Sequence, residues 1–154
     1  MIPEFNRLST EETDLMFKAP FLIIILIAGA DDKIDKHEMK QAIAISKLKL
    51  KRARRELVEY YNIVGQDFED KLKIFIHDLP KDTGERNEEI SKELVKLNDI
   101  FPKLDKKFAV NFYESMKDIA VKIAESSGGV FGFMSVGYEE SKVVDLQMIR
   151  EPSK

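Results

Sequence analysis

The chain has 154 residues, which suits one domain, residues 1–154, built around a single substantial core. Hydrophobic residues make up 44% and charged residues 34%, a balance typical of a soluble, helix-rich protein that argues against extended disorder. The absence of cysteine excludes disulfides, thiolate zinc sites and cysteine nucleophiles and fits a cytoplasmic location, and the net charge of −3 argues against general nucleic-acid or anionic-lipid binding.

The first element is a short amphipathic helix. Ser9 or Thr10 can cap it, and three acids in the next residues suit the positive end of the helix dipole. This helix is expected to end near Phe17. Pro20 then suits the first turn of a new helix, where the missing N–H costs nothing.

The second helix carries the most apolar run in the chain, Phe21 to Ala30, which has no polar side chain on any face. A helix of this kind is buried all round. It is about 15 Å long, roughly half the thickness of a hydrocarbon core, so we expect a core helix and no membrane span. The acids that precede it also argue against a secretory signal.

An acidic segment follows this run and is the candidate metal site. Asp35 and Glu38 have the spacing of a capping box for a helix reaching about Leu48. Carboxylate oxygens are also the ligands that Ca²⁺ and Mg²⁺ prefer. Capping and solvation explain the same acids without a metal, and the spacing does not match an EF-hand loop. The candidate ligands are Asp31, Asp32, Asp35 and Glu38, completed by Glu139 and Glu140.

A basic segment, residues 47–55, contains six cations and no acid. Such a concentration of charge is a candidate contact for phosphate or an acidic partner. The favoured interpretation is a solvated turn whose cations lie near the negative end of a helix, because aromatic residues are not interleaved. The candidate residues are Lys47, Lys49, Lys51, Arg52, Arg54 and Arg55.

Three apolar stripes at helical spacing occupy the middle of the chain. Gly65 and Asp67 make a break within the first stripe plausible, so one helix or two are both compatible with it. The second stripe starts at about Glu85 and leads to Pro102. The helix that carries the third stripe is expected over 104–126. The stripes are Leu57, Tyr61, Val64, Phe68, Leu72, Phe75 and Leu79; Ile90, Leu94, Leu97 and Phe101; and Phe108, Phe112, Met116, Ile119 and Ile123.

The C-terminal region begins with a glycine-rich segment, residues 128–137, that is incompatible with a regular helix. Phe131, Phe133 and Met134 within it can form an exposed apolar surface, which favours a protein partner or a homodimer. A final helix is expected over 138–149. No strand pattern of convincing length occurs, so the predicted class is all-α.

Two parts of the chain share a plan of apolar helix, Ile-Ala, polar turn, acids and a further helix. Ile27-Ala28 aligns with Ile123-Ala124, which suggests two pseudo-symmetric helix-loop-helix units. The segment Ala30 to Glu38 resembles the A-D-G-x-I-x-x-x-E signature of the tellurite-resistance TerB-like family, with Asp32 in place of the glycine, and residues 124–140 resemble its second, glycine-rich element. The resemblance implies about seven helices, a surface acid cluster that binds a divalent cation, and a role in stress response or as an interaction module.

Two functional classes are predicted, and a third possibility is nucleic-acid or anionic-lipid binding through residues 47–55, with an affinity that falls steeply with salt. The preferred one is a non-enzymatic helical module that binds a partner and is gated by a cation at the acidic segment. The alternative is a metal-dependent hydrolase that uses the same acids around Mg²⁺, which requires acids from two helices in one cleft. The two histidines, His37 and His77, lack the context of a catalytic base, and His77 suits a structural role at a helix end.

Overall fold

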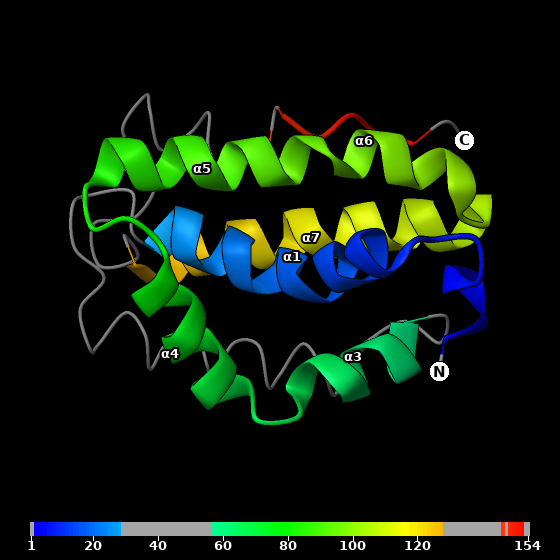
Figure 1. The fold of residues 1–154 in the computed structure, drawn as a ribbon, viewed down its shortest axis with the longest axis horizontal. Helices are drawn as coiled ribbons and strands as arrows, with labels where there is room; N and C mark the ends of the chain where they lie inside the picture. The colour runs from blue at the N-terminus through cyan, green and yellow to red at the C-terminus, as the bar shows by residue number, and fades with distance from the viewer. Residues whose placement is uncertain (1, 29–56, 128–145, 147, 153–154) are drawn as a thin grey trace.

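The computed structural model describes residues 2–28, 57–127, 146 and 148–152, and every regular element in these ranges is helical (Figure 1). This confirms the all-α class for the part of the chain described. The expected helix over 35–48 and the start of the last one lie outside these ranges. In chain order the elements are the 3-10 helix η1 (Pro3–Phe5), α1 (Thr10–Ala28), α3 (Val58–Gly65), α4 (Phe68–Asp78), α5 (Thr83–Val95), α6 (Leu97–Ile100), the 3-10 helix η3 (Phe101–Lys103) and α7 (Lys106–Ser127).

Helix α1 begins with the predicted cap. The Ser9 hydroxyl accepts a hydrogen bond from the Glu12 amide at 3.1 Å, and the Glu12 carboxylate accepts one from the Ser9 amide at 2.8 Å. These two bonds form a reciprocal capping box. The second oxygen of Glu12 also accepts a hydrogen bond from Lys103 Nζ at 2.7 Å, which joins the start of α1 to the segment just before α7.

The prediction of two helices around Pro20 is wrong, because α1 continues through this proline to Ala28. Pro20 has no N–H, so the carbonyl group of Met16, four residues earlier, loses its usual partner within the helix. The Tyr60 hydroxyl on α3 donates a hydrogen bond to that carbonyl oxygen at 2.5 Å. The hydroxyl of a residue 44 positions further along the chain therefore supplies the hydrogen bond that the Met16 carbonyl oxygen lacks within the helix, and α1 continues without a break.

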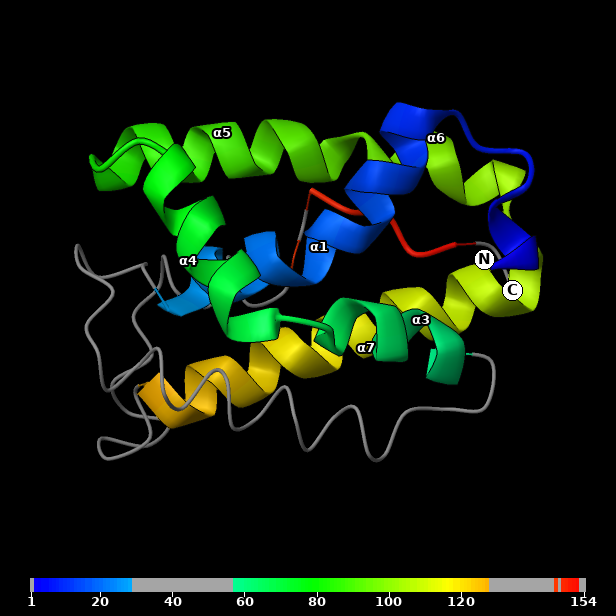
Figure 2. The same ribbon diagram turned by 60° about the horizontal axis from the view of Figure 1, so that its bottom comes forward.

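The apolar run is buried as predicted. Side chains from Phe21 to Ile27 are 0–2% exposed. Helix α1 packs mainly against α7 and α5, and α4 covers another side (Figures 1 and 2). In the described part of the chain, no helix combines the length and apolar character that crossing a membrane requires.

The first stripe forms two helices, α3 and α4, that separate where Gly65 and Asp67 suggested a break. Asp67 lies between the two helices and has a φ of 52°. This left-handed conformation changes the direction of the chain between α3 and α4. Phe75 is only partly buried and packs against the core. The other members of the stripe are all buried: Leu57, Tyr61, Val64, Phe68, Leu72 and Leu79.

The second and third stripes are confirmed as core faces. Helix α5 starts slightly earlier than expected, because the Asp82 side chain accepts a hydrogen bond from the Glu85 amide at 2.9 Å and caps it. Every residue predicted for these two stripes is buried: Ile90, Leu94, Leu97, Phe101, Phe108, Phe112, Met116, Ile119 and Ile123.

An aromatic cluster lies between α1, α3 and α7. The Tyr60 ring stacks on Phe17 with 5.6 Å between centroids and meets Phe112 edge-on at 5.5 Å. The neighbouring Tyr61 hydroxyl forms a buried hydrogen bond with Ser115 on α7. Burial raises the pKa of both phenols above the usual 10, so both hydroxyls stay protonated and can donate. Two adjacent tyrosines thus fasten α3 to both α1 and α7.

The expected final helix does not reach Ile149. Leu146 has a φ of 49°, outside the helical region, and the Ile149 amide donates to the Leu146 carbonyl oxygen at 2.9 Å in a turn. Both side chains are nevertheless buried, at 0% and 4% exposed. The apolar positions were therefore predicted correctly, whereas the helical backbone over these residues was not.

The capping box gives α1 a defined pH dependence. Lys103, and then the Ser9 amide, lower the pKa of Glu12 below its ordinary value of 4.5. Because the folded pKa lies below the unfolded one, the stabilisation is fully present above about pH 4.5 and is lost as the pH falls through the folded pKa. Urea denaturation of the wild type and Glu12→Gln should therefore show a gap in stability near neutral pH that closes in acid. A gap of constant size would contradict this role.

Candidate functional site

The residues predicted to carry function lie outside the described ranges. This applies to the acidic segment and its two additional acids, to the basic segment and to His37. The structure does describe the two helices that precede these acids. The acidic segment follows α1, which is described to Ala28, and the two additional acids follow α7, which is described to Ser127. The geometry of these two ends therefore bears on the metal-site prediction.

Helices α1 and α7 run parallel and end at the same end of the molecule (Figures 1 and 2). Their starts are joined by the bond between Glu12 and Lys103, and Phe5 packs on Phe108 with 5.6 Å between centroids. They have 19 and 22 residues, so both are roughly 30 Å long. We call the end at which both helices stop the loop end.

The ends of α1 and α7 each contribute partial negative charge to the loop end. A helix C-terminus carries about half a negative charge, which cations in the last turn usually offset. The last turns of α1 and α7 contain no basic residue. Two negative helix ends therefore lie on the same side of the molecule without a cation in either last turn.

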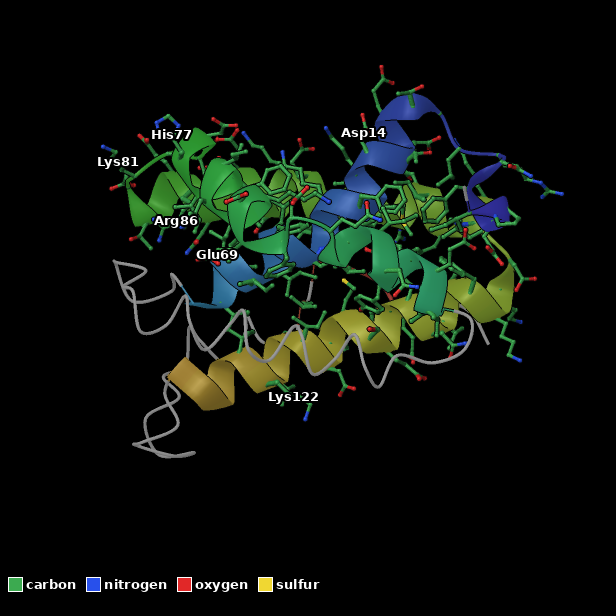
Figure 3. All side chains as sticks on the ribbon, turned by 90° about the horizontal axis from the view of Figure 1, so that it is seen from below. Asp14, Glu69, His77, Lys81, Arg86 and Lys122 are labelled. Carbon is green, nitrogen blue, oxygen red and sulfur yellow. The ribbon has the colours of Figure 1, made fainter. Side chains whose placement is uncertain are left out.

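Basic side chains lie at the loop end: His77 at the end of α4, Lys81 between α4 and α5, and Arg86 on α5 (Figure 3). His77 is largely exposed, and its Nδ1 is 3.5 Å from an Asp78 carboxylate oxygen. Its position in the last turn of α4 is the one expected from the sequence. Arg86 is only 6% exposed, and its Nη1 donates to the carbonyl oxygen of Lys81 at 3.4 Å.

A shallow groove of about 460 Å³ lies at the other end of α1, against α5 and α6. Two of its acids are engaged: Glu12 bonds to Lys103, and Glu93 lies 2.7 Å from Lys96. The groove is thus a polar surface with internal ion pairs. It is lined by Glu11, Glu12, Asp14, Leu15, Lys18, Glu93, Lys96, Asp99 and Ile100.

Among the described residues, no three acidic or histidine side chains converge closely enough to hold a metal ion. Comparisons with protein-family models, with curated proteins and with solved structures found no match to this chain. The interpretation of the site therefore depends on the geometry of the loop end and on the sequence of the segments that leave it.

Sequence reasoning missed Arg86, although a signal was present. The second apolar stripe, extended back by one turn from Ile90, falls on this arginine. A cation in the first turns of a helix is also disfavoured by the dipole, so its presence there points to a partner outside the helix. A charged residue at a position of a core-facing stripe is therefore the sequence signal that identifies Arg86.

Proposed function

We propose that this chain is a non-enzymatic helical interaction module that binds a divalent cation at the loop end. The observation that supports this is the parallel arrangement of α1 and α7, whose negative ends stop together without a basic residue in either last turn. Asp31 and Asp32 follow Ala28 by three and four residues. They add formal charge next to a helix end that already favours a cation.

The proposed ligands come from two segments. Asp31, Asp32, Asp35 and Glu38 follow α1, and Glu139 and Glu140 follow α7. Because α1 and α7 end on the same side, the chain can bring both sets to one ion without crossing the molecule. Six carboxylates supply the oxygen ligands that Ca²⁺ requires, and Mg²⁺ would use fewer of them together with water.

We further propose that the complete chain has about seven helices in two pseudo-symmetric halves, as the TerB-like resemblance implies. The equivalent positions Ile27 and Ile123 support this, because both are buried near the ends of the two parallel helices. The role inferred for the module is a cation-dependent interaction with a protein partner or a second copy in a stress response.

The deciding experiment is calorimetric titration of the chelator-treated protein with Ca²⁺ and Mg²⁺. We expect micromolar binding that is lost in Asp31→Ala and weakened in Glu38→Ala. At a hundredfold excess over the Kd, bound cation should stabilise the fold by about 2.7 kcal/mol. Asp14→Ala is the matched control, since this exposed acid lies on α1 far from the loop end (Figure 3).

The outcomes separate clearly. Binding that survives in Asp31→Ala would move the site elsewhere. No heat and no stabilisation up to millimolar cation would exclude the metal site and leave an interaction module without a cation gate.

A further inference from the structure

An open groove of about 530 Å³ lies where α6, η3 and the start of α7 meet the last described segment of the chain, residues 148–152 (Figure 2). Small-molecule sites in proteins commonly have volumes of about 300–1,000 Å³, so the groove has the size of a ligand site. We call it the C-terminal groove. It is lined by Asn98, Phe101, Pro102, Leu104, Lys106, Ala109, Arg150, Glu151 and Pro152.

The segment that forms one wall of this groove is held in place by the bundle. Asn98 on α6 donates from Nδ2 to the carbonyl oxygen of Met148 at 2.9 Å, and its Oδ1 accepts from the Arg150 amide at 2.7 Å. Ile149, between these two residues, is buried in the core at 4% exposed. The Arg150 side chain therefore leaves from a fixed backbone position at the edge of the groove.

The wall contributed by η3 and α7 is largely apolar. Phe101, Leu104 and Ala109 are buried against the core, and Pro102 lines the groove beside them. Because these side chains are packed into the bundle, this wall keeps its shape when a ligand binds. A ligand that contacts it needs an apolar body.

Two basic side chains from different walls line the same groove. Lys106 is the first residue of α7, whose N-terminus adds partial positive charge there, and Arg150 belongs to the segment. Asp105, the residue before Lys106, is engaged as the cap of α7 and accepts from the Phe108 amide at 3.3 Å. Among the described residues, no acid forms an ion pair with Lys106 or Arg150. One guanidinium and one ammonium group are thus available to an anion.

Glu151 limits the charge of the anion that fits. It is the acid that lines the groove together with Lys106 and Arg150, so the lining carries one net positive charge near neutral pH. A single carboxylate balances this charge, whereas a phosphate dianion meets the repulsion of Glu151. A guanidinium group also matches a carboxylate through two parallel hydrogen bonds. The lining therefore favours a monocarboxylate over a phosphate.

We propose that the C-terminal groove binds a small organic monocarboxylate that has an apolar body. The carboxylate pairs with Arg150 and Lys106, and the apolar body lies against the wall that contains Phe101 and Pro102. The bound ligand joins the start of α7 to the C-terminal segment. This inference goes beyond the proposed cation-dependent interaction, and it does not depend on the loop end, because the groove lies at the opposite end of α7.

The test uses hydrocinnamate, a monocarboxylate with a phenyl ring, as the probe. It is titrated into the full-length, isotope-labelled chain without added divalent cation, and amide shifts are followed by two-dimensional NMR. We expect saturable shifts of the Asn98 side-chain amide and of the Ala109 and Arg150 backbone amides, with a Kd on the order of 1 mM. Hydrocinnamide, which has the same shape without the charge, should bind about fivefold more weakly or less. Inorganic phosphate should give no saturable shift of these amides up to about 20 mM.

Four substitutions of exposed side chains identify the groups that recognise the probe. Arg150→Gln should raise the Kd for hydrocinnamate about fivefold or more, and Lys106→Gln should raise it by a smaller factor, because an ammonium group acts as a point charge. Glu151→Gln should lower the Kd and allow phosphate to bind. Lys122→Gln is the matched control, since this exposed lysine lies further along α7, outside the groove, and should leave the Kd unchanged (Figure 3).

The results distinguish recognition in the groove from general attraction to a charged surface. Saturable shifts that weaken in Arg150→Gln and persist in Lys122→Gln would support the site. A lack of saturable shifts up to about 20 mM would overturn it. Equal affinity for hydrocinnamide or for phosphate, or equal effects of Arg150→Gln and Lys122→Gln, would overturn it as well. None of these results bears on cation binding at the loop end.

Discussion

Truncation of Phe112 to alanine is expected to lower the free energy of unfolding by about 3–5 kcal/mol. This side chain is 0% exposed on α7. The rings of Tyr60, Phe101 and Phe108 surround it with centroid distances of 5.5, 5.9 and 6.5 Å. Alanine removes the buried apolar surface and the ring contacts, and it leaves a cavity between helices that cannot close fully. Urea denaturation followed by circular dichroism measures the loss.

Val121→Ala on the same helix is the matched control. Val121 is 40% exposed, so its truncation should change the free energy of unfolding by no more than about 0.5 kcal/mol. A total stability of about 5–15 kcal/mol means that Phe112→Ala can unfold a marginal domain. Phe112→Leu keeps most of the volume and should show a smaller but measurable loss. Equal costs for Phe112→Ala and Val121→Ala would contradict a tightly packed aromatic cluster.

The core could be predicted from the sequence because helical periodicity is a local signal. The stripe from Phe108 to Ile123 recurs every three or four residues, so a single helix brings its members to one face. The run from Phe21 to Ile27 has no polar face at all, and only full burial satisfies it. The break between α3 and α4 was also local, since Asp67 tolerates the left-handed conformation that the turn requires.

The two incorrect predictions concern segments whose backbone conformation depends on a side chain that is distant in the sequence. Pro20 interrupts a hydrogen bond, and only the fold brings Tyr60 to the Met16 carbonyl. Similarly, the apolar spacing of Leu146 and Ile149 suits a helix, yet Asn98 binds the backbone in a non-helical form. Both partners lie more than 40 residues away along the chain. Propensity and periodicity carry no information about such contacts.

The candidate site depends on charge clustering and not on periodicity. Charge clustering identified the acidic segment, which stays a prediction because Asp31 to Glu38 lie outside the described residues. The parallel direction of α1 and α7, and hence the shared loop end, could not be predicted, because it depends on the packing of helices about 100 residues apart. The shared loop end is the structural observation on which the proposed cation site depends.

Replacing Tyr60 with phenylalanine is expected to lower the free energy of unfolding by about 1–3 kcal/mol. The substitution keeps the ring and its packing but removes the donor to the Met16 carbonyl oxygen. That oxygen has no helical partner because Pro20 occupies the position four residues later. A buried acceptor without a donor bears the full cost of its lost hydration. Urea denaturation of the wild type and Tyr60→Phe measures the difference.

A double-mutant cycle with Pro20→Ala tests the cause. Alanine supplies the missing N–H, which can bond to the Met16 carbonyl within the helix. Tyr60→Phe should therefore cost less in the Pro20→Ala chain than in the wild type, with a coupling of about 1 kcal/mol. Tyr61→Phe is the control, since its hydroxyl bonds to Ser115 and its cost should be the same in both chains. If Tyr60→Phe costs the same in both chains, the bond from Tyr60 does not compensate for the proline, and another contact must keep α1 continuous.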